Sequence, residues 1–297
     1  MEIRVLRYFF ETAREGNMTR AAQRLHISQP TMSKQLKELE EELGVKLFTR
    51  SNYSIRLTEA GMLLRERAED IVSLADKTFE EFRALDEIGK GDFYVGAAES
   101  DAVRYFTETV HKLQQKHPGI RCNIYSGNME DVCEKLDKGV LDFAIIMSYV
   151  DLAKYNYLPL PASDTWGVIT RRDDPLSDRS SLSVRDLIGL PLLCSRQWLD
   201  QDFPQWFGLE TEDANIVATW NLTYNASVMV KTGMGYAITY DKLADTSENS
   251  ELAYVPLRGV PQSDIFIIWR KNQAFSPAAR LLLDTLRQTF RPDPDEI

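Results

Sequence analysis

The chain of 297 residues has only three cysteines and three histidines, and it contains no long run of apolar residues. Cys122, Cys133 and Cys194 show neither the paired spacing of a disulfide framework nor that of a zinc motif. No apolar stretch approaches the roughly 20 residues of a membrane span, and the first residues lack the apolar core of a signal peptide. We therefore expect a cytoplasmic protein with no membrane partner. The scattered histidines predict neither a metal site nor a catalytic triad. The Gly-Met-Gly segment at 233–235 is interpreted as a helix stop and not as a nucleotide loop, so we expect no cofactor.

Net positive charge is also missing, because the whole chain has a formal charge of −10. The charge is unevenly distributed: residues 1–60 hold 10 Lys and Arg against 8 Asp and Glu, a net of +2, and the remainder has a net of −12. Only the N-terminal part is thus suited to DNA. Its small excess predicts that binding depends on a few placed contacts and on more than one copy of the domain.

Residues 21–61 have the pattern of two short helices, a tight turn and a hairpin wing. Ser28 is a candidate N-cap of the second helix, Pro30 suits its first turn, and Gly44 suits its end. Together these features predict a winged helix-turn-helix. Helical spacing predicts the buried face of the second helix: Met32, Leu36, Leu39 and Leu43.

The other face of this helix has side chains that suit the major groove of DNA. A glutamine can make paired hydrogen bonds to adenine, and a lysine can reach guanine or phosphate. Short strands at 47–50 and 54–57, about a tip at 51–53, place two arginines where they can contact the DNA backbone. The predicted contacts are Gln29, Pro30, Thr31, Ser33, Lys34, Lys37, Arg50 and Arg56. Because the C-terminal half of the helix is acidic, we expect its N-terminal half to enter the groove; the acidic residues are Glu38, Glu40, Glu41 and Glu42.

A long helix is predicted at about 58–89, with Thr58 as its cap. Its apolar residues recur at alternating spacings of four and three, which is typical of a coiled-coil seam. A helix of this length is too long for one small domain to bury, so we expect a second copy of the chain as its partner; packing on its own domain is the alternative. The seam is Leu64, Ala68, Ile71, Ala75, Thr78, Phe82 and Leu85, of which we assign Leu64, Ile71, Phe82 and Leu85 to dimerisation.

Strands and helices alternate beyond residue 90, which predicts a parallel, doubly wound α/β fold. A second unit of this kind runs from about 166 to 257, and the segments 159–161 and 258–261 connect the two. We therefore expect lobe I at about 90–161 and 262–297, and lobe II at about 162–261. The domains are thus 1–60, the linker helix 58–89, and 90–297.

Ligands of open parallel sheets lie beyond the carboxyl ends of the strands, where helix N-termini offer free N–H groups. Turns of this kind in the two lobes predict a site for a small ligand, such as an organic anion that an arginine could clamp. The alternative is that these polar residues only cap helices. Cys194 in one turn is interpreted as a packing residue and not as a redox sensor. The predicted effector residues are Ser100, Asp101, Gly127, Asn128, Ser195, Arg196, Asn221 and Tyr224.

The N-terminal run resembles the signature of the LysR-type transcriptional regulators. The pattern AA..L..SQP..S.Q...LE..LG..LF.R.....LT.AG is matched from Ala21 to Gly61, and the resemblance continues through GDFYVGAAES, HPGIRCNIYSGN, LDKGVLDFAI, DDPLSDRSSLSVRDL and KTGMGYAITY. Asn52, Tyr53 and Tyr240 depart from the family pattern.

The resemblance implies an effector domain with two lobes, similar to periplasmic solute-binding proteins of type 2. It also implies a DNA-binding regulator and not an enzyme. Double-stranded DNA, a small-molecule effector, further copies of the chain as a dimer of dimers, and RNA polymerase are the expected partners. A solute-binding module and an α/β enzyme are the alternative functions.

Overall fold

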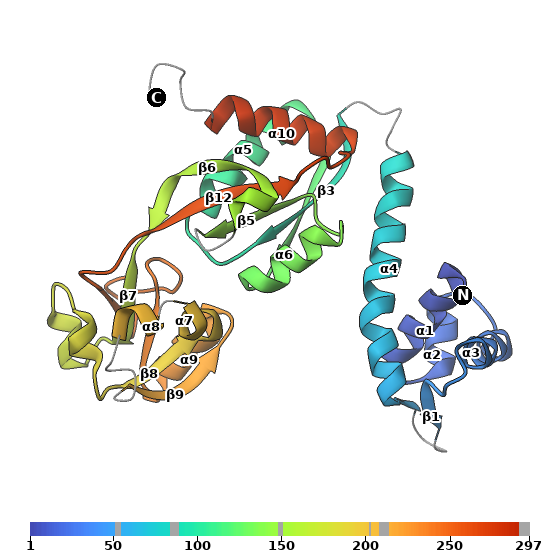
Figure 1. Cartoon of the computed structure of the whole chain (residues 1–297), viewed down its shortest axis with the longest axis horizontal. Coiled ribbons are helices and arrows are strands. Elements are labelled where there is room, and N and C mark those ends of the chain that lie inside the picture. The colour runs from blue at the N-terminus through green and yellow to red at the C-terminus, as the bar shows by residue number, and fades with distance from the viewer. Residues whose placement is uncertain (51–54, 84–88, 148–150, 202, 208–213, 291–297) are drawn as a thin grey trace. The chain divides into compact units, whose positions relative to one another are not determined.

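The computed structural model describes residues 1–50, 55–83, 89–147, 151–201, 203–207 and 214–290. The chain divides into two compact units, Met1–Arg83 and Ala84–Ile297, each with a hydrophobic core (Figure 1). Within the described ranges, no helix is long and apolar enough to cross a membrane.

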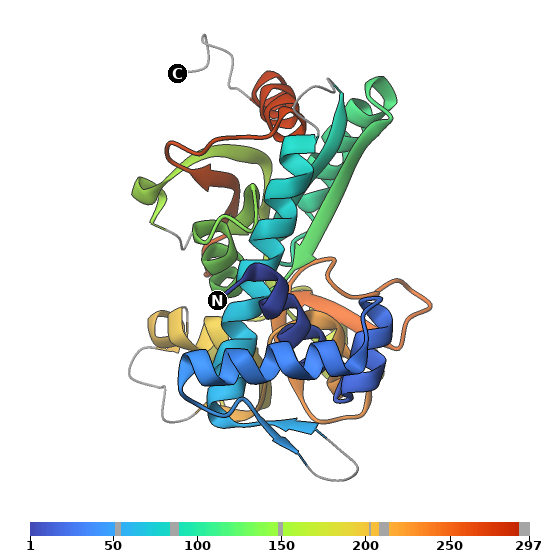
Figure 2. The same cartoon turned by 90° about the vertical axis from the view of Figure 1, so that its right-hand side faces the viewer.

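The first unit is a helix-turn-helix with a two-stranded wing and a long final helix (Figure 2). Its elements are α1 (Ile3–Glu15), α2 (Met18–Arg24), α3 (Gln29–Leu43), β1 (Phe48–Arg50), β2 (Ile55–Leu57) and α4 (Glu59–Arg83). The first three helices share one core, which the base of the wing completes. The Phe9 ring of α1 lies 5.2 Å from the Phe48 ring, centroid to centroid. The predicted wing tip at 51–53 lies outside the described residues.

Helix α4 begins directly against the base of the wing. The Thr58 hydroxyl accepts a hydrogen bond from the Gly61 N–H (3.0 Å) and donates one to the Lys46 carbonyl (2.6 Å). A Cβ atom at Gly61 would lie 2.1 Å from the carbonyl oxygen of Leu47. Only glycine therefore lets α4 approach the wing this closely.

The predicted seam of α4 is divided between two environments. Leu64 and Ala68 pack into the core of their own unit together with Val72, so the alternative of packing on its own domain describes this half of the helix. Ile71 and Phe82 are 38% and 71% exposed. Leu85 lies outside the described residues.

Lobe I of the second unit is a five-stranded sheet covered on both faces (Figure 1). Its elements are β3 (Lys90–Ala97), α5 (Val103–Lys116), β4 (Gly119–Ser126), α6 (Met129–Asp137), β5 (Phe143–Met147), β6 (Tyr155–Asp164), β12 (Ser263–Arg270) and α10 (Pro277–Phe290). The strand order is β4-β3-β5-β12-β6. Helices α5 and α10 pack together over one face, and α6 packs with a separate apolar cluster on the other.

Lobe II repeats this arrangement with a second five-stranded sheet in the order β11-β7-β10-β8-β9. Its elements are β7 (Trp166–Arg171), β8 (Pro191–Ser195), α7 (Arg196–Gln201), α8 (Phe203–Phe207), β9 (Asn215–Trp220), α9 (Thr223–Lys231), β10 (Tyr236–Tyr240) and β11 (Leu252–Pro256). Each core strand predicted from the sequence is present, but the sequence reading missed β11.

The expectation of wholly parallel sheets was wrong for the strands near the crossovers. β12 runs antiparallel to both β5 and β6, and β7 runs antiparallel to β10 and β11. The crossover predicted at 159–161 lies inside β6, where Pro159 pairs with Phe266. β6 is an edge strand, so no strand pairs with its outer side. A proline, which lacks an N–H donor, is tolerated in such a strand. The chain instead passes between the lobes at Thr165, where β6 ends and β7 begins.

Candidate functional site

Helix α3 carries the predicted DNA contacts on a face that its packing leaves free. The Ser28 hydroxyl caps the helix by accepting the Thr31 N–H at 3.3 Å, and Pro30 needs no acceptor in the first turn. Met32, Leu36 and Leu39 are fully buried. On the opposite side, the structure leaves these side chains exposed, with Ser33 partly exposed: Gln29, Pro30, Thr31, Lys34 and Lys37.

The C-terminal half of α3 differs from the expectation in two respects. Leu43 is exposed, so the apolar stripe ends at Leu39. Glu40 is only 4% exposed, and its carboxylate accepts the backbone N–H groups of Leu47 (2.9 Å) and Phe48 (3.2 Å). Glu40 thus does not belong to the acidic end of the exposed face, because it holds the start of the wing.

The pKa of Glu40 reflects these contacts. Burial alone would raise it, but the hydrogen bond from Lys46 and those from the two backbone N–H groups lower the pKa below its ordinary value. The carboxylate therefore remains ionised in the folded unit. Sequence reasoning missed this role. The available signal was a basic residue six positions after a glutamate and two positions before the first wing strand.

The two lysines of the free face each lie near an acidic residue one turn further along the helix. Lys34 is 3.8 Å from Glu38, and Lys37 is 3.4 Å from Glu41. All four side chains are at least half exposed, and pairs of this kind contribute only about 0.3–0.5 kcal/mol. Both lysines are therefore available for phosphate at little cost.

The wing supplies the remaining predicted backbone contacts. In the register of β1 and β2, Arg56 lies opposite Thr49, whose hydroxyl donates to the Arg56 carbonyl at 3.2 Å. The Arg56 side chain is exposed. Arg50 ends β1 opposite Ile55, and its side chain lies outside what the structure describes.

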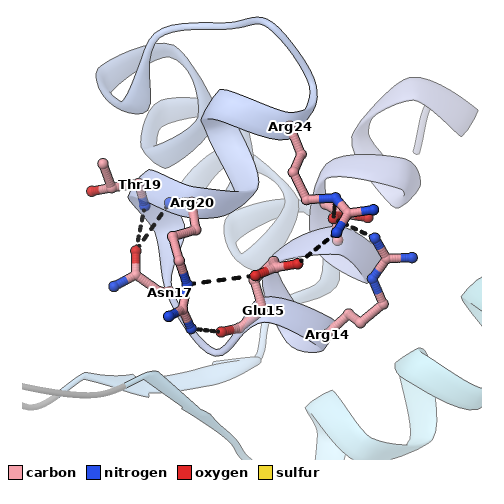
Figure 3. A network of polar contacts seen from close by, with 7 residues as sticks. Arg14, Glu15, Asn17, Thr19, Arg20 and Arg24 are labelled. Carbon is pink, nitrogen blue, oxygen red and sulfur yellow. Dashed lines mark hydrogen bonds and ion pairs between the residues drawn. The ribbon is translucent and has the colours of Figure 1, made fainter.

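A charged network joins α1 to α2 and positions the start of the helix-turn-helix (Figure 3). The Asn17 side chain caps α2 by accepting the N–H groups of Thr19 (2.9 Å) and Arg20 (3.0 Å). Arg20 also donates to the Glu15 carbonyl at 2.7 Å, and Arg24 lies 3.2 Å from the Glu15 carboxylate. The basic residues of α2 are thus paired with acceptors of α1 within the same unit.

A cavity of about 580 Å³ lies between the two lobes of the second unit. Five of the eight predicted effector residues line it: Gly127, Asn128, Ser195, Arg196 and Asn221. The other three are not among its lining residues. Ser100 is buried, and its hydroxyl accepts the Ala102 N–H (3.0 Å); Asp101 lies 3.5 Å from Lys242; Tyr224 is 74% exposed on α9.

The helices that start at the cavity are capped by acceptors of the chain itself. Asn128 accepts the Asp131 N–H of α6 (2.8 Å), and Ser195 accepts the Trp198 N–H of α7 (3.1 Å). Glu99 of lobe I reaches across to α9 of lobe II, where it accepts the Thr223 N–H at 2.6 Å. The capping alternative therefore describes Asn128 and Ser195, and Glu99 connects the lobes.

Aromatic residues form much of the cavity wall. Of these residues, only Trp220 belongs to a turn that the sequence placed in the cleft. The aromatic lining residues are Tyr155, Trp166, Trp198, Trp220 and Tyr240. The indole N–H groups of Trp166 and Trp220 have no acceptor among the described residues. Trp220 ends β9 next to Asn221, which the sequence placed in the cleft. Trp166 begins β7, a strand predicted as core, where nothing in the sequence distinguished a tryptophan facing the cavity from one in the core.

The cysteines give no indication of redox chemistry. Burial raises the pKa of Cys194 to about 12 and that of Cys122 and Cys133 to about 11, so the reactive thiolate is disfavoured at all three. Among the described residues, no group of three or more His, Cys, Asp and Glu side chains could hold a metal ion.

Comparison with known proteins agrees with this architecture. The LysR substrate binding domain matches residues 89–291, and the bacterial regulatory helix-turn-helix protein, lysR family, matches residues 3–62. The regulator BudR of Raoultella terrigena is 32% identical over 188 residues, which is 63% of this chain and 65% of BudR. The activator CmpR of Synechocystis sp. is 27% identical over 94% of this chain and 92% of CmpR.

The fold is also that of a solved family member. CbnR, a LysR family transcriptional regulator, has a TM-score of 0.75 at 21% identity, over 98% of this chain and 100% of CbnR. CbnR complexed with its target DNA gives a TM-score of 0.72, over 97% and 100%. Since the substrate-binding family alone matches more than half of the sequence, and a helix-turn-helix of the same family precedes it, this chain belongs to the LysR family of transcriptional regulators.

Proposed function

We propose that this protein is a cytoplasmic transcriptional regulator in which the N-terminal half of α3 reads base edges and an effector between the two lobes controls the response. The observation that carries the proposal is the division of α3. Its apolar side is buried, and the opposite side presents an amide and two ammonium groups on exposed side chains. Gln29, Thr31, Ser33 and Lys34 would face bases, because their amide, hydroxyl and ammonium groups match the donors and acceptors of the major groove. Pro30 would face the bases with apolar contact alone.

Lys37, Arg50 and Arg56 would contact mainly the phosphate backbone. These contacts set the position of the helix on the duplex and supply the affinity that depends on salt. One winged helix with few such cations binds weakly alone. Paired copies on one site are therefore part of the proposal.

The exposed side of α4 supports a homodimer. Four large apolar side chains, at spacings of eight, three and eight residues, lie on one side of the helix: Leu63, Ile71, Leu74 and Phe82, each at least 38% exposed. An exposed apolar stripe of this kind typically marks an interaction site. Two such dimers would join through residues 90–297, and RNA polymerase is a further partner that bound regulators can contact.

The effector would occupy the cavity between the lobes and touch both. Gly127 and Asn128 line it from lobe I, and Ser195, Arg196 and Asn221 line it from lobe II. A ligand in this position changes the equilibrium between arrangements of the lobes only through its difference in affinity for them. In this proposal, residues 1–60 read the DNA, the helix at 58–89 pairs two chains, and residues 90–297 bind the effector.

Binding assays on a cognate and a scrambled duplex test the DNA assignment, after selection of the cognate site from random duplexes. Gln29→Ala should cost about 1–3 kcal/mol on the cognate site and little on the scrambled one. Arg56→Ala should weaken binding to both duplexes. It should also reduce the slope of log affinity against log salt concentration by about one. Equal loss on both duplexes from Gln29→Ala would contradict base reading by this residue.

Sedimentation tests the pairing face. Ile71→Asp should split the dimer, because a charge would be buried without a partner. Val228→Asp is the matched control, since this valine is similarly exposed on α9 and should leave the dimer intact. A folded Ile71→Asp protein of unchanged mass would show that α4 does not pair through this face.

A further inference from the structure

The cavity between the lobes has many more acidic than basic side chains. Of the described residues, only Lys154 and Arg196 bring positive charge to its lining. The six lining carboxylates come from both lobes: Glu99, Glu130, Glu134, Asp137, Asp151 and Asp200. This six-to-two ratio exceeds the ratio of 45 to 35 in the whole chain. Some of these groups are already engaged: Glu134 pairs with Lys138, and Asp137 accepts a hydrogen bond from the Tyr155 hydroxyl at 2.9 Å.

The positions that usually attract an anion in such a cavity are already occupied. The N-terminus of α9 receives the Glu99 carboxylate, so an anionic ligand would meet both a filled site and a like charge. The N-terminus of α6 is capped by Asn128 and has Glu130 and Asp131 in its first turn. These acidic residues neutralise the positive end of the helix dipole.

The inner wall favours a ligand with an apolar body. Trp166 is only 5% exposed, and its ring packs at a tilt on that of Tyr240, 4.0 Å from centroid to centroid. Both residues line the cavity. Trp220 adds a third aromatic surface from β9. Aromatic faces attract cations as well as apolar groups. The indole N–H of Trp166 is itself buried and has no acceptor among the described residues, so Trp166 contributes apolar surface to the wall.

We propose that the effector class of this cavity is an organic cation: an amine with an apolar or aromatic body. This inference rests on the proposed function, and it replaces the organic anion expected from the sequence. The aromatic wall holds the body of the ligand, and the lining carboxylates hold its ammonium group. Five of these carboxylates belong to lobe I and Asp200 belongs to lobe II, so a cation that contacts both sets favours the closer arrangement of the lobes.

Three probes that share a 2-phenylethyl group and differ in their polar end test the sign of the ligand's charge on the full-length protein. They are 2-phenylethylamine, 2-phenylethanol and 3-phenylpropanoate. Binding of each probe is measured by calorimetry and by thermal shift at low ionic strength. The amine should bind best, at roughly tenfold higher affinity than the carboxylate, with the alcohol between them. A carboxylate that binds as well as the amine, or no binding of any probe at millimolar concentration, overturns the proposal.

Charge variants locate the binding. Glu130→Gln combined with Asp200→Asn removes one exposed carboxylate from each lobe and should weaken the amine by about three- to tenfold, with no change for the alcohol. Glu108→Gln is the control, because this exposed residue of α5 does not line the cavity. Unchanged affinity for the amine in the double variant would place its binding elsewhere and contradict the assignment.

The outcomes separate this inference from the proposed function. A carboxylate that binds in the cavity and alters the DNA complex would leave the regulator proposal intact and refute only the charge of the effector. A Gln29→Ala protein without a sequence-dependent defect would refute the reading assignment, whatever the amine does.

Discussion

Each unit of the chain buries a carboxylate near its candidate site, but the two carboxylates have opposite surroundings. Glu40 in the first unit accepts two backbone N–H groups and an ammonium group, and its pKa is lowered. Asp164 in the second unit has one oxygen without a hydrogen-bond partner among the described residues. Burial raises the pKa of Asp164 to about 6, although the hydrogen bond with Ser100 opposes this. Burial alone therefore does not set the charge of a carboxylate; the number of donors that meet it does.

The difference has a structural meaning. Glu40 joins α3 to the wing, so its charge is a permanent part of the DNA-reading unit. Asp164 is the last residue of β6, next to the passage between the lobes, and Asp101 and Asp241 add to its raised pKa while Lys242 opposes it. The first unit is thus stabilised by its buried charge, and the second carries one at a cost.

The largest expected effect is that of Glu40→Ala. It leaves the N–H groups of Leu47 and Phe48 without their acceptor in a buried place, which should cost about 2–4 kcal/mol of stability in the first unit. Hydrogen exchange on the full-length protein should show faster exchange in α1 to α4 and unchanged exchange in the two lobes. Equal loss of protection from exchange in both units would contradict the conclusion that Glu40 stabilises the first unit alone.

The second prediction concerns the contact of α4 with the wing. Gly61→Ala should destabilise the first unit by about 1–3 kcal/mol, because its Cβ would overlap the Leu47 carbonyl and force a backbone shift. Gly44→Ala is the control in the same unit. Its φ of +70° costs about 1–2 kcal/mol, but no atom lies within 4 Å of the added Cβ. A smaller effect at Gly61 than at Gly44 would contradict the close approach.

The third prediction is a pH dependence of opposite sign in the two units. Since the folded pKa of Asp164 is raised to about 6, the folded state binds more protons than the unfolded one between about pH 4 and 6, and the stability of the second unit should fall as pH rises through this window. Asp164→Asn should remove this slope and stabilise the unit by about 1–2 kcal/mol at neutral pH.

For Glu40 the sign is reversed. Its folded pKa lies below the ordinary 4.5, so the stabilisation of the first unit is present above that pH and is lost as pH falls through the folded pKa. Urea unfolding followed by exchange at pH 4, 5, 6 and 7 measures both slopes. Slopes of the same sign in the two units would refute the assignment of the two carboxylates.

The smallest effect is expected at the exposed pairs of α3. Glu38→Gln releases Lys34 from its pair and removes one negative charge near the DNA, so affinity for any duplex should rise by at most about 0.5 kcal/mol without a change of sequence preference. Stability should stay within measurement error. A large gain, or a changed preference, would mean that Glu38 itself contacts the DNA site.

Most of the fold could be predicted from the sequence, because its elements depend on local patterns. The caps at Ser28 and Thr58, the stop at Gly44 and most core strands follow from side chains within a few positions of each other. The errors occur where distant segments decide. The antiparallel setting of β7 and β12, and the place of the prolines in an edge strand, depend on strands that pair across more than 80 residues.

The two candidate sites show the same division. On α3 the periodicity of apolar residues determined which side is free, so the predicted reading residues needed no knowledge of the rest of the chain. The cavity collects residues from Ala98 to Leu243, and the sequence could place its turns but not the side chains that meet there. Whether Asn128 caps a helix, or Glu99 crosses to another lobe, depends on neighbours supplied by the fold.

The sequence by itself therefore determined the order of the units, the free side of α3 and the membership of the family. Helix periodicity, caps and the family signature are all patterns of neighbouring residues along the chain. Only the tertiary structure decided that Glu40 is buried, that Leu64 packs within its own unit and that the cavity is acidic and aromatic. The physical reason is that burial, pKa and cavity lining are properties of side chains brought together from distant positions.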